Sequence, residues 1–299
     1  MKEYIISCES NIDLPYEYVV ERNLSIINYT YIIDEVVYVD DMGKDPGSLS
    51  KFYAFIDAGK MPSTTQINLN EYVDYFEKLM QEGKDVLHIS FSSAMTGSVG
   101  NAILAAKEVG ERYPNQRIEV LDSLSASSGY GLLIDEVLDL RDSGKSYEEI
   151  KEWVLGNVQH LHHYFYSTDL KYFRRGGRVS GVAATLGAVL NICPMMRIDE
   201  NGKIIAFTKA RGKKNAIKKV LGYMEKIAYD GNNYSGKCWI NHSNSPEDAL
   251  SLKDATEERF PNLKGKIRIY NIGTVIGSHT GPGTISIFYF GDERKNFTE

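Results

Sequence analysis

The residues best suited to chemistry in this sequence lie where a predicted strand runs into hydroxyl-bearing side chains. Val86 to Ile89 is a short apolar run typical of a buried parallel strand, and apolar spacing predicts a helix over 99–109. The hydroxyl residues that follow the strand are Ser90, Ser92, Ser93, Thr96 and Ser98. Free N–H groups and the positive end of a helix dipole suit an anion here. From this stretch alone, the alternative is that Thr96 is a helix cap that binds nothing.

Three further segments contain candidate ligand-binding residues. Hydroxyl residues at 63–65 and 122–128 follow strands or precede helices, and in parallel sheets such segments meet at the edge where ligands bind. We expect both to converge with the 90–98 segment. His279 stands in the glycine-rich turn 277–283, which lets the backbone approach a ligand closely, although a lone loop histidine is more often simply exposed.

Basic residues form two clusters that have two interpretations. The members are Lys171, Arg174, Arg175 and Arg178 in the first cluster, and Lys209, Arg211, Lys213 and Lys214 in the second. They form either a solvated face or a docking patch for an acidic partner or a phosphorylated group. Composition alone leaves both interpretations open.

Motifs of several common sites are absent from the sequence. There is no Walker phosphate loop, no Gly-x-Gly-x-x-Gly and no Gly-x-Ser-x-Gly, so neither a nucleotide cofactor nor a hydrolase elbow is predicted. His160, His162 and His163 lie at the end of a predicted helix with no acidic or cysteine partner nearby in sequence. We therefore expect no metal site.

The candidate residues must be positioned by an α/β fold with two domains. Strands predicted at 4–7, 25–31, 35–39, 86–89 and 117–121 alternate with helices, which implies a doubly wound parallel sheet. In the second half, a hairpin signal at Asp199 to Gly202 interrupts the crossovers and predicts a mixed sheet. We expect one α/β domain over 1–165 and another over 166–299.

Composition narrows the class of protein. The 299 residues are enough for two domains, and apolar and charged fractions of 42% and 25% are typical of a soluble globular protein. The net charge of −6 argues against a nucleic-acid partner. No apolar run approaches ~18 residues, so membrane insertion is not expected. Three widely spaced cysteines fit the reducing cytoplasm, where we expect this protein to act.

Several segments together resemble the DegV family. They occur in that family's order, they cover nearly the whole chain, and they are Glu9-Ser10, Asp13-Leu-Pro15, Ser63-Thr-Thr-Gln66, Ile89-Ser-Phe-Ser-Ser-Ala-Met-Thr96-Gly, Asp122-Ser-Leu-Ser-Ala-Ser-Ser-Gly-Tyr-Gly131, Arg175-Gly-Gly-Arg178-Val-Ser and His279-Thr-Gly-Pro-Gly283. The resemblance implies a long-chain fatty acid bound between two α/β domains. It also implies a non-catalytic subunit of bacterial fatty acid kinase, which presents the carboxylate to a separate ATP-dependent subunit and so supplies phospholipid synthesis.

Candidate site residues follow from the same resemblance, position by position. The expected contacts of the fatty acid head group, with hydroxyls at positions 64 and 96 as the carboxylate ligands, are Thr64, Thr65, Thr96, Gly97 and His279. The possible contacts of a kinase partner or of phosphate are Arg211, Arg174, Arg175 and Arg178.

The chain departs from the family's pattern at three places. Glu9-Ser10-Asn11 stands where Asp-Ser-Thr is usual, which changes the expected mouth of the pocket. Thr64-Thr-Gln66-Ile67 replaces Thr-Ser-Gln-Pro, and Thr96-Gly-Ser98 replaces Ser-Gly-Thr. Because both of these changes keep hydroxyl groups, head-group binding is still expected.

The chemistry of the residues agrees with a bound fatty acid. A carboxylate removed from water must be hydrogen-bonded, and hydroxyls at a helix N-terminus are neutral donors. The small apolar segment 182–190 predicts a helix that either lines the acyl tail or belongs to an ordinary core. The alternative function is an acyl hydrolase that uses Ser90, Ser92 or Ser93 with His279. A third possibility, nucleic-acid docking through the basic cluster, fits the acidic net charge poorly.

Overall fold

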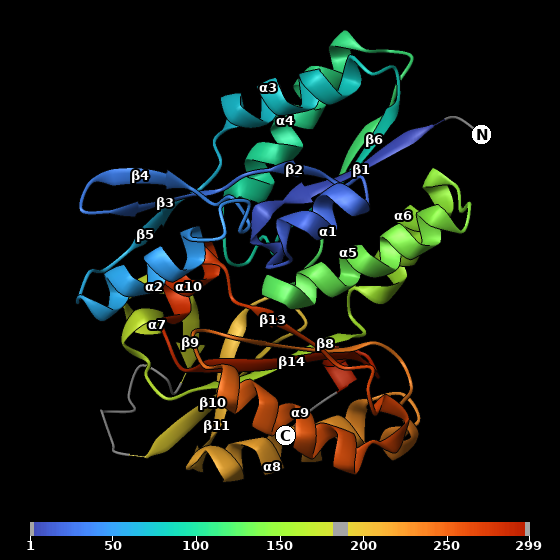
Figure 1. The fold of residues 1–299 in the computed structure, drawn as a ribbon. Coiled ribbons are helices and arrows are strands. Elements are labelled where there is room, and N and C mark those ends of the chain that lie inside the picture. The colour runs from blue at the N-terminus through green and yellow to red at the C-terminus, as the bar shows by residue number, and fades with distance from the viewer. Residues whose placement is uncertain (1–2, 182–190, 297–299) are drawn as a thin grey trace.

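A computed structural model describes residues 3–181 and 191–296 of the chain. Within this part of the chain, three sheets and the helices that cover them are stacked in layers (Figure 1). The predicted α/β class is confirmed, with a parallel sheet in the first half and a mixed sheet in the second. The helix predicted over 182–190 lies outside the described residues.

The first sheet is entirely parallel and has the strand order β2-β1-β6-β7. Its strands are β1 (Tyr4–Glu9), β2 (Ser25–Ile27), β6 (Asp85–Ser90) and β7 (Ile118–Asp122). One face is covered by α3 (Leu69–Met80) and α4 (Ser98–Arg112). The other is covered by α1 (Tyr16–Glu21), α5 (Ser127–Asp142) and α6 (Tyr147–Asn157). The strands therefore end at one edge, as the doubly wound prediction requires.

The second sheet is mixed and has the order β13-β12-β14-β8-β10-β11-β9. Its strands are β8 (Leu161–Ser167), β9 (Val179–Gly181), β10 (Ile192–Ile198), β11 (Ile204–Arg211), β12 (Cys238–His242), β13 (Arg268–Asn271) and β14 (Thr284–Phe290). Helices α8 (Lys213–Ile227) and α9 (Pro246–Arg259) pack on one face. Helix α5 packs on the other face, so it lies between the two large sheets.

A small antiparallel sheet, β4-β3-β5, was not predicted as a separate unit. The strand predicted over 25–31 is two strands, because the chain leaves the parallel sheet after β2 and begins β3 (Thr30–Ile33). Strand β3 pairs with β4 (Val36–Val39) and with β5 (Ser63–Thr65). Helices α2 (Ser48–Asp57) and α10 (Thr274–Thr280) pack against this sheet, which brings residues from the two ends of the chain together (Figure 1).

Some local predictions are corrected by the structure. His279 lies in the last turn of α10 and not in a loop, since the 273–281 backbone forms helical hydrogen bonds despite its glycines. His162 and His163 lie in β8, because α6 ends at Asn157. The predicted boundary between residues 165 and 166 falls inside β8, and the division into domains 1–165 and 166–299 stays a prediction. Among the described helices, none combines the length and apolar character needed to cross a membrane.

Candidate ligand-binding cavity

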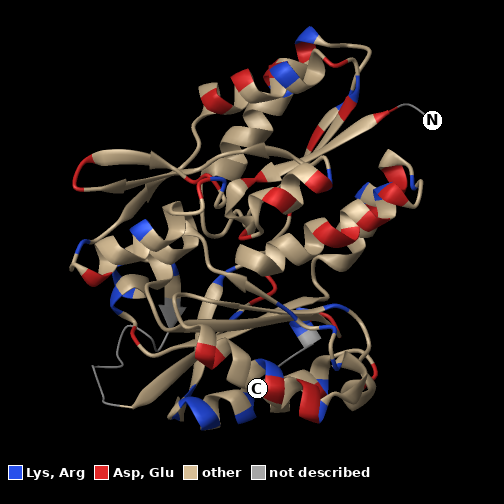
Figure 2. Ribbon diagram, viewed as in Figure 1, with Lys and Arg blue, Asp and Glu red and all other residues tan. Residues whose placement is uncertain are grey.

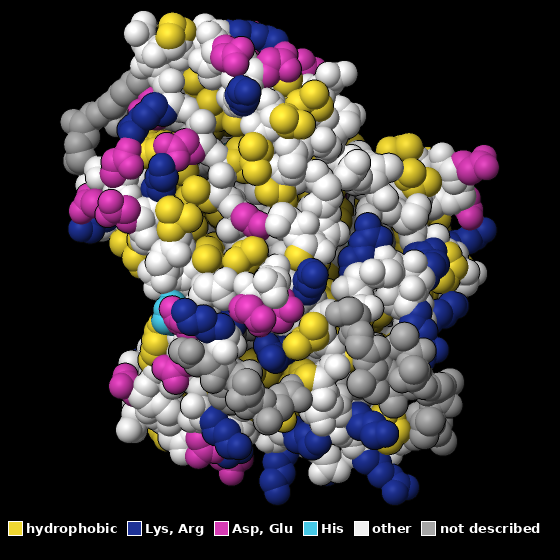
Figure 3. All heavy atoms as spheres, turned by 180° about the vertical axis from the view of Figure 1, so that it is seen from behind, with side chains coloured by type: hydrophobic (Ala, Val, Ile, Leu, Met, Phe, Trp, Pro, Cys, Tyr) yellow, Lys and Arg dark blue, Asp and Glu magenta, His cyan; other side chains and the backbone are white. Residues whose placement is uncertain are grey.

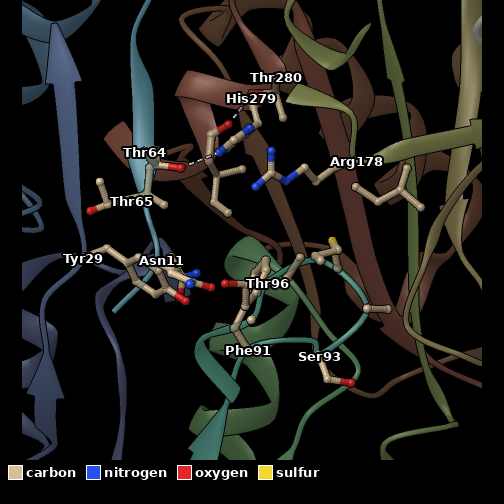
Figure 4. Close-up of a pocket in the computed structure, with 18 of the residues that line it drawn as sticks. Asn11, Tyr29, Thr64, Thr65, Phe91, Ser93, Thr96, Arg178, His279 and Thr280 are labelled. Carbon is tan, nitrogen blue, oxygen red and sulfur yellow. Dashed lines mark hydrogen bonds between the residues drawn. The ribbon is translucent and has the colours of Figure 1, made fainter. Parts of the chain in front are cut away.

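A cavity of about 490 Å³ lies beside the carboxyl end of β6, a size typical of small-molecule sites. Its wall is built from the turn after β1, strand β5, the 91–97 loop after β6, helix α7 (Lys171–Gly176) and helix α10 (Figure 4). The predicted convergence of 63–65 with 90–98 is therefore observed in this wall. The third hydroxyl segment, 122–128, contributes Ala126.

The polar part of the wall contains Thr64 and His279, which point toward each other (Figure 4). The Thr64 hydroxyl lies 2.7 Å from Nε2 of His279 and forms a hydrogen bond with it. Burial, with the charges of Arg178 and Arg175, lowers the pKa of His279 to about 4. The imidazole is therefore neutral near pH 7 and offers one donor and one acceptor to the head-group region.

Thr96 and Gly97 also line the cavity, at the beginning of α4. Thr96 is not the N-cap: the cap residue is Gly97, and the Thr96 hydroxyl accepts from the Ser98 N–H at 3.2 Å and lies 3.0 Å from the Ser98 hydroxyl. A Cβ atom on Gly97 would lie 2.4 Å from Oε1 of Gln66, so a larger residue here would require the Gln66 side chain to move. Thr65 lines the cavity as well, with its hydroxyl bonded to that of Thr30 at 2.7 Å.

Apolar side chains form the rest of the wall. They come from both halves of the chain and are Phe91, Met95, Phe173, Ile204, Val275 and Ile276. A cavity with hydroxyls and a neutral histidine in one part and apolar side chains elsewhere suits an amphipathic ligand with an anionic head.

Two cavity residues, Asn11 and Tyr29, were not predicted as site residues. Both are almost fully buried, at 2% and 4% exposure. Neither Asn11 Oδ1 nor the Tyr29 hydroxyl has a hydrogen-bond partner among the described residues. Figure 4 places both side chains next to Thr96. Asn11 could have been found from its departure from the family's pattern, whereas Tyr29 gave no signal within its strand-like segment.

Glu9 is a buried carboxylate that fixes the end of β6, a role that sequence analysis also missed. Its Oε2 accepts from the Phe91 N–H at 2.9 Å, and Phe91 lines the cavity. The other contacts are with the hydroxyls of Tyr72, Ser90 and Tyr130 and with Nε2 of His88. Burial raises the pKa of Glu9, but the charge of His88 and these hydrogen bonds outweigh it and leave the pKa below its usual value.

The four predicted arginine contacts are in different places. Arg178 lines the cavity and is exposed. Arg175 instead donates to the carbonyl oxygens of Pro62 and Ser278, so it joins β5 to α10. Arg174 is exposed on α7.

Arg211 lies outside the cavity, at the end of β11. It belongs to a shallow basic groove on α8 and β11, which also contains Lys209, Lys218 and Lys219. Figure 2 shows the basic residues along α8, and the space-filling view shows Lys and Arg side chains gathered at that end of the molecule (Figure 3). The two basic clusters of the sequence are therefore separate, and only the first reaches the cavity.

The serines of the hydrolase alternative are not arranged around His279. Ser90 is bonded to Glu9 at 2.5 Å, and the Ser92 hydroxyl donates to the Gly202 carbonyl oxygen at 2.8 Å. Ser93 lines the cavity, but the hydrogen-bond partner of His279 within the described part of the chain is Thr64.

A metal site finds no support in the part of the chain that the structure describes. No group of three or more His, Cys, Asp or Glu side chains is arranged there to hold an ion. Burial lowers the pKa of His162 to about 3, and burial also lowers the pKa of His163. These two histidines are therefore neutral core residues of β8.

The fold and sequence of this chain match those of a known family of α/β proteins. A family model described as "Uncharacterised protein, DegV family COG1307" matches residues 5–292. A DegV domain-containing protein of Clostridium perfringens is 35% identical over 99% of this chain and 100% of its own length. One from Lactococcus lactis is 32% identical over 95% of this chain and 96% of its own. The chain belongs to the DegV family.

Solved structures show the same fold. A DegV family protein from Thermus thermophilus described as fatty acid binding superposes with a TM-score of 0.83 at 23% identity, over 98% of this chain and 100% of its own. DegV of Bacillus subtilis, described as a fatty acid binding protein, gives a TM-score of 0.80 at 23% identity, over 98% of this chain and 100% of its own.

Proposed function

We propose that this protein binds a long-chain fatty acid in the cavity and presents its carboxylate to a separate ATP-dependent kinase subunit. The observation that carries the proposal is the cavity itself, in which Thr64, Thr96 and a neutral His279 share the wall with a set of apolar side chains. Family relatives of known structure that are described as fatty acid binding support the ligand class.

The head group is held by neutral donors. A carboxylate between Thr64 and Thr96 accepts from their hydroxyls and from the backbone N–H groups near Gly97, where the α4 dipole also favours negative charge. A neutral His279 donates from Nε2 to the Thr64 hydroxyl, which leaves that hydroxyl to donate its own proton to the carboxylate.

The acyl tail supplies the affinity. Each buried methylene contributes ~0.8 kcal/mol, so a sixteen-carbon acid gains on the order of 10 kcal/mol before the cost of ordering it. Phe173 and Ile204 come from the second half of the chain and Phe91 from the first, so the tail lies between elements of both halves.

Presentation to a kinase requires that the head group be reached from outside. Arg178 is exposed and lines the cavity, so its guanidinium is placed to contact an incoming phosphoryl group. This chain carries no nucleotide-binding loop of its own, which agrees with ATP binding on another subunit.

Native mass spectrometry of freshly purified protein tests the proposal. We expect a fatty acid at near one-to-one stoichiometry, identified after denaturation. Protein that carries no lipid and takes up no added palmitate would contradict the binding function. Formation of acyl phosphate from ATP by this chain alone would contradict the division of labour with a kinase.

A further inference from the structure

Helix α10 carries His279 to the cavity from the second half of the chain. In sequence it connects β13 to β14, both in the seven-stranded sheet, but in space it packs on β3 and β5 of the small sheet and on α7. The contact between His279 and Thr64 therefore depends on how α10 is held against the first half.

A buried carboxylate, Asp40, joins α10 to two other segments of the cavity wall. One oxygen, Oδ1, accepts from the Thr274 hydroxyl at 2.9 Å, at the first residue of α10. The other, Oδ2, accepts from the Ser10 hydroxyl at 2.7 Å, next to the cavity residue Asn11. The Asp40 N–H donates to the Tyr29 carbonyl at 2.9 Å. Ser10 completes the connection, because its hydroxyl accepts from the Tyr29 N–H at 3.1 Å.

A second carboxylate supports the same helix. Oδ1 of Asp13 accepts from the Gly273 N–H at 3.0 Å, and Oδ2 accepts from the Ser127 hydroxyl. Asp13 and Asp40 are thus adjacent to each other at the start of α10, and both belong to the first half of the chain.

A carboxylate at position 40 can make the hydrogen bonds that this site requires. Burying its charge, however, costs free energy. It accepts hydrogen bonds through both oxygens at once, whereas an asparagine side chain has a single acceptor oxygen. Asp40 is 3% exposed, and burial raises its pKa to about 6. A neutral side chain would be easier to bury. Hydrogen bonds to an ionised carboxylate are strong, so those from Ser10 and Thr274 can hold the turn after β1 and the start of α10 in place relative to each other.

We propose that Asp40 is a positioning residue for the head-group site, which holds α10 and the Ser10–Asn11 turn so that His279 meets Thr64. This role rests on the proposed function, since it concerns the same cavity. Asp40 does not touch the ligand. It acts through Thr274 and Ser10 on residues that do.

Two substitutions test the role. Thr274→Val keeps the shape of the side chain and removes only the bond from α10 to Asp40, and Asp40→Asn removes one acceptor. We expect each to raise the Kd for palmitate about tenfold, the effect of losing a hydrogen bond to a charged group. The double variant should be little weaker than the single ones, because both remove the same link.

Asp41→Asn is the matched control. Asp41 is the neighbouring carboxylate, but its oxygens accept from the amides of Gly43 and Asp45 and from the Ser48 hydroxyl, within one loop. The substitution makes the same change of charge one residue away, and we expect the palmitate Kd of the unaltered protein.

Amide hydrogen exchange over 274–280 in the lipid-free protein separates positioning from folding. We expect faster exchange there in Thr274→Val and Asp40→Asn, by more than their loss of melting temperature explains. Kd values equal to those of the unaltered protein, or losses that only follow the melting temperature, would overturn the role. If the unaltered protein binds no palmitate, the proposed function fails first and this role with it.

Discussion

The Thr64 hydroxyl and Nε2 of His279 form a 2.7 Å hydrogen bond although 215 residues separate them in the chain. Thr64 lies on β5 in the first half, and His279 lies on α10 in the second. This single bond brings together two of the five residues that the sequence resemblance assigned to the head group. It also shows that both halves of the chain contribute to the polar part of the cavity wall.

The first prediction concerns the carboxylate ligands. Thr64→Ala combined with Thr96→Ala removes two hydroxyls from the cavity and should raise the Kd for palmitate about tenfold or more for each lost contact to the charged head. Isothermal titration calorimetry with palmitate measures the change in Kd. Thr30→Ala is the control, because the Thr30 hydroxyl bonds to Thr65 and does not line the cavity. Unchanged lipid occupancy in the double variant would show that the carboxylate lies elsewhere.

The second prediction follows from the pKa of His279, which is lowered from 6.5 to about 4. The unfolded chain therefore binds this proton more tightly than the folded protein does between those two values. The stability contributed by neutral His279 is present above pH 6.5 and is lost as the pH falls toward 4. We expect His279→Gln to lose less stability than the unaltered protein across this window.

Urea unfolding at a series of pH values measures how the free energy of unfolding of each protein depends on pH. The buried His162 and His163 are present in both proteins, so their contributions cancel in the comparison. If the free energies of unfolding of His279→Gln and the unaltered protein changed in parallel with pH, His279 would not be held neutral in the folded protein.

The third prediction concerns the carboxylate of Glu9. Glu9→Gln removes an acceptor from the buried hydroxyls of Tyr72, Ser90 and Tyr130, so we expect the free energy of unfolding to fall by about 1–3 kcal/mol, the cost of leaving a buried polar group without its partner. Chemical denaturation measures the loss. Glu111→Gln, an exposed carboxylate on α4, should change little. Equal stability in the two variants would contradict a structural role for the Glu9 network.

Much of the fold could be predicted from local pattern. The alternation of strands and helices predicts the parallel sheet, and Asp199 to Gly202 predicts the β10–β11 hairpin that the structure contains. The capping box of Ser146 and Glu149 at the start of α6 is likewise formed by residues close in sequence. These features depend on residues close in sequence, so their signals are contained within short segments.

Features that depend on distant contacts were missed. The small sheet was not predicted because β3 and β5 are short and pair across about thirty residues, which include β4 and α2. His279 was placed in a turn because its glycines outweighed helical pattern, whereas packing on β3 and β5 stabilises α10. Asp40 gave no signal, since its segment has the composition of a loop and its partners, Ser10 and Thr274, lie far away in sequence.

The last prediction separates the two basic clusters by function. Arg178 is exposed and lines the cavity, whereas Arg211 belongs to the groove on α8 and β11. With an ATP-dependent fatty acid kinase subunit, Arg178→Ala should slow acyl phosphate formation about tenfold or more, because a guanidinium stabilises charge on a transferring phosphoryl group. The palmitate Kd should change much less, since the proposed ligands of the carboxylate are neutral donors. Arg211→Ala is the matched control and should leave phosphorylation at the rate of the unaltered protein. If Arg211→Ala slowed phosphorylation and Arg178→Ala did not, the kinase contact would lie on the α8 groove instead of at the cavity mouth.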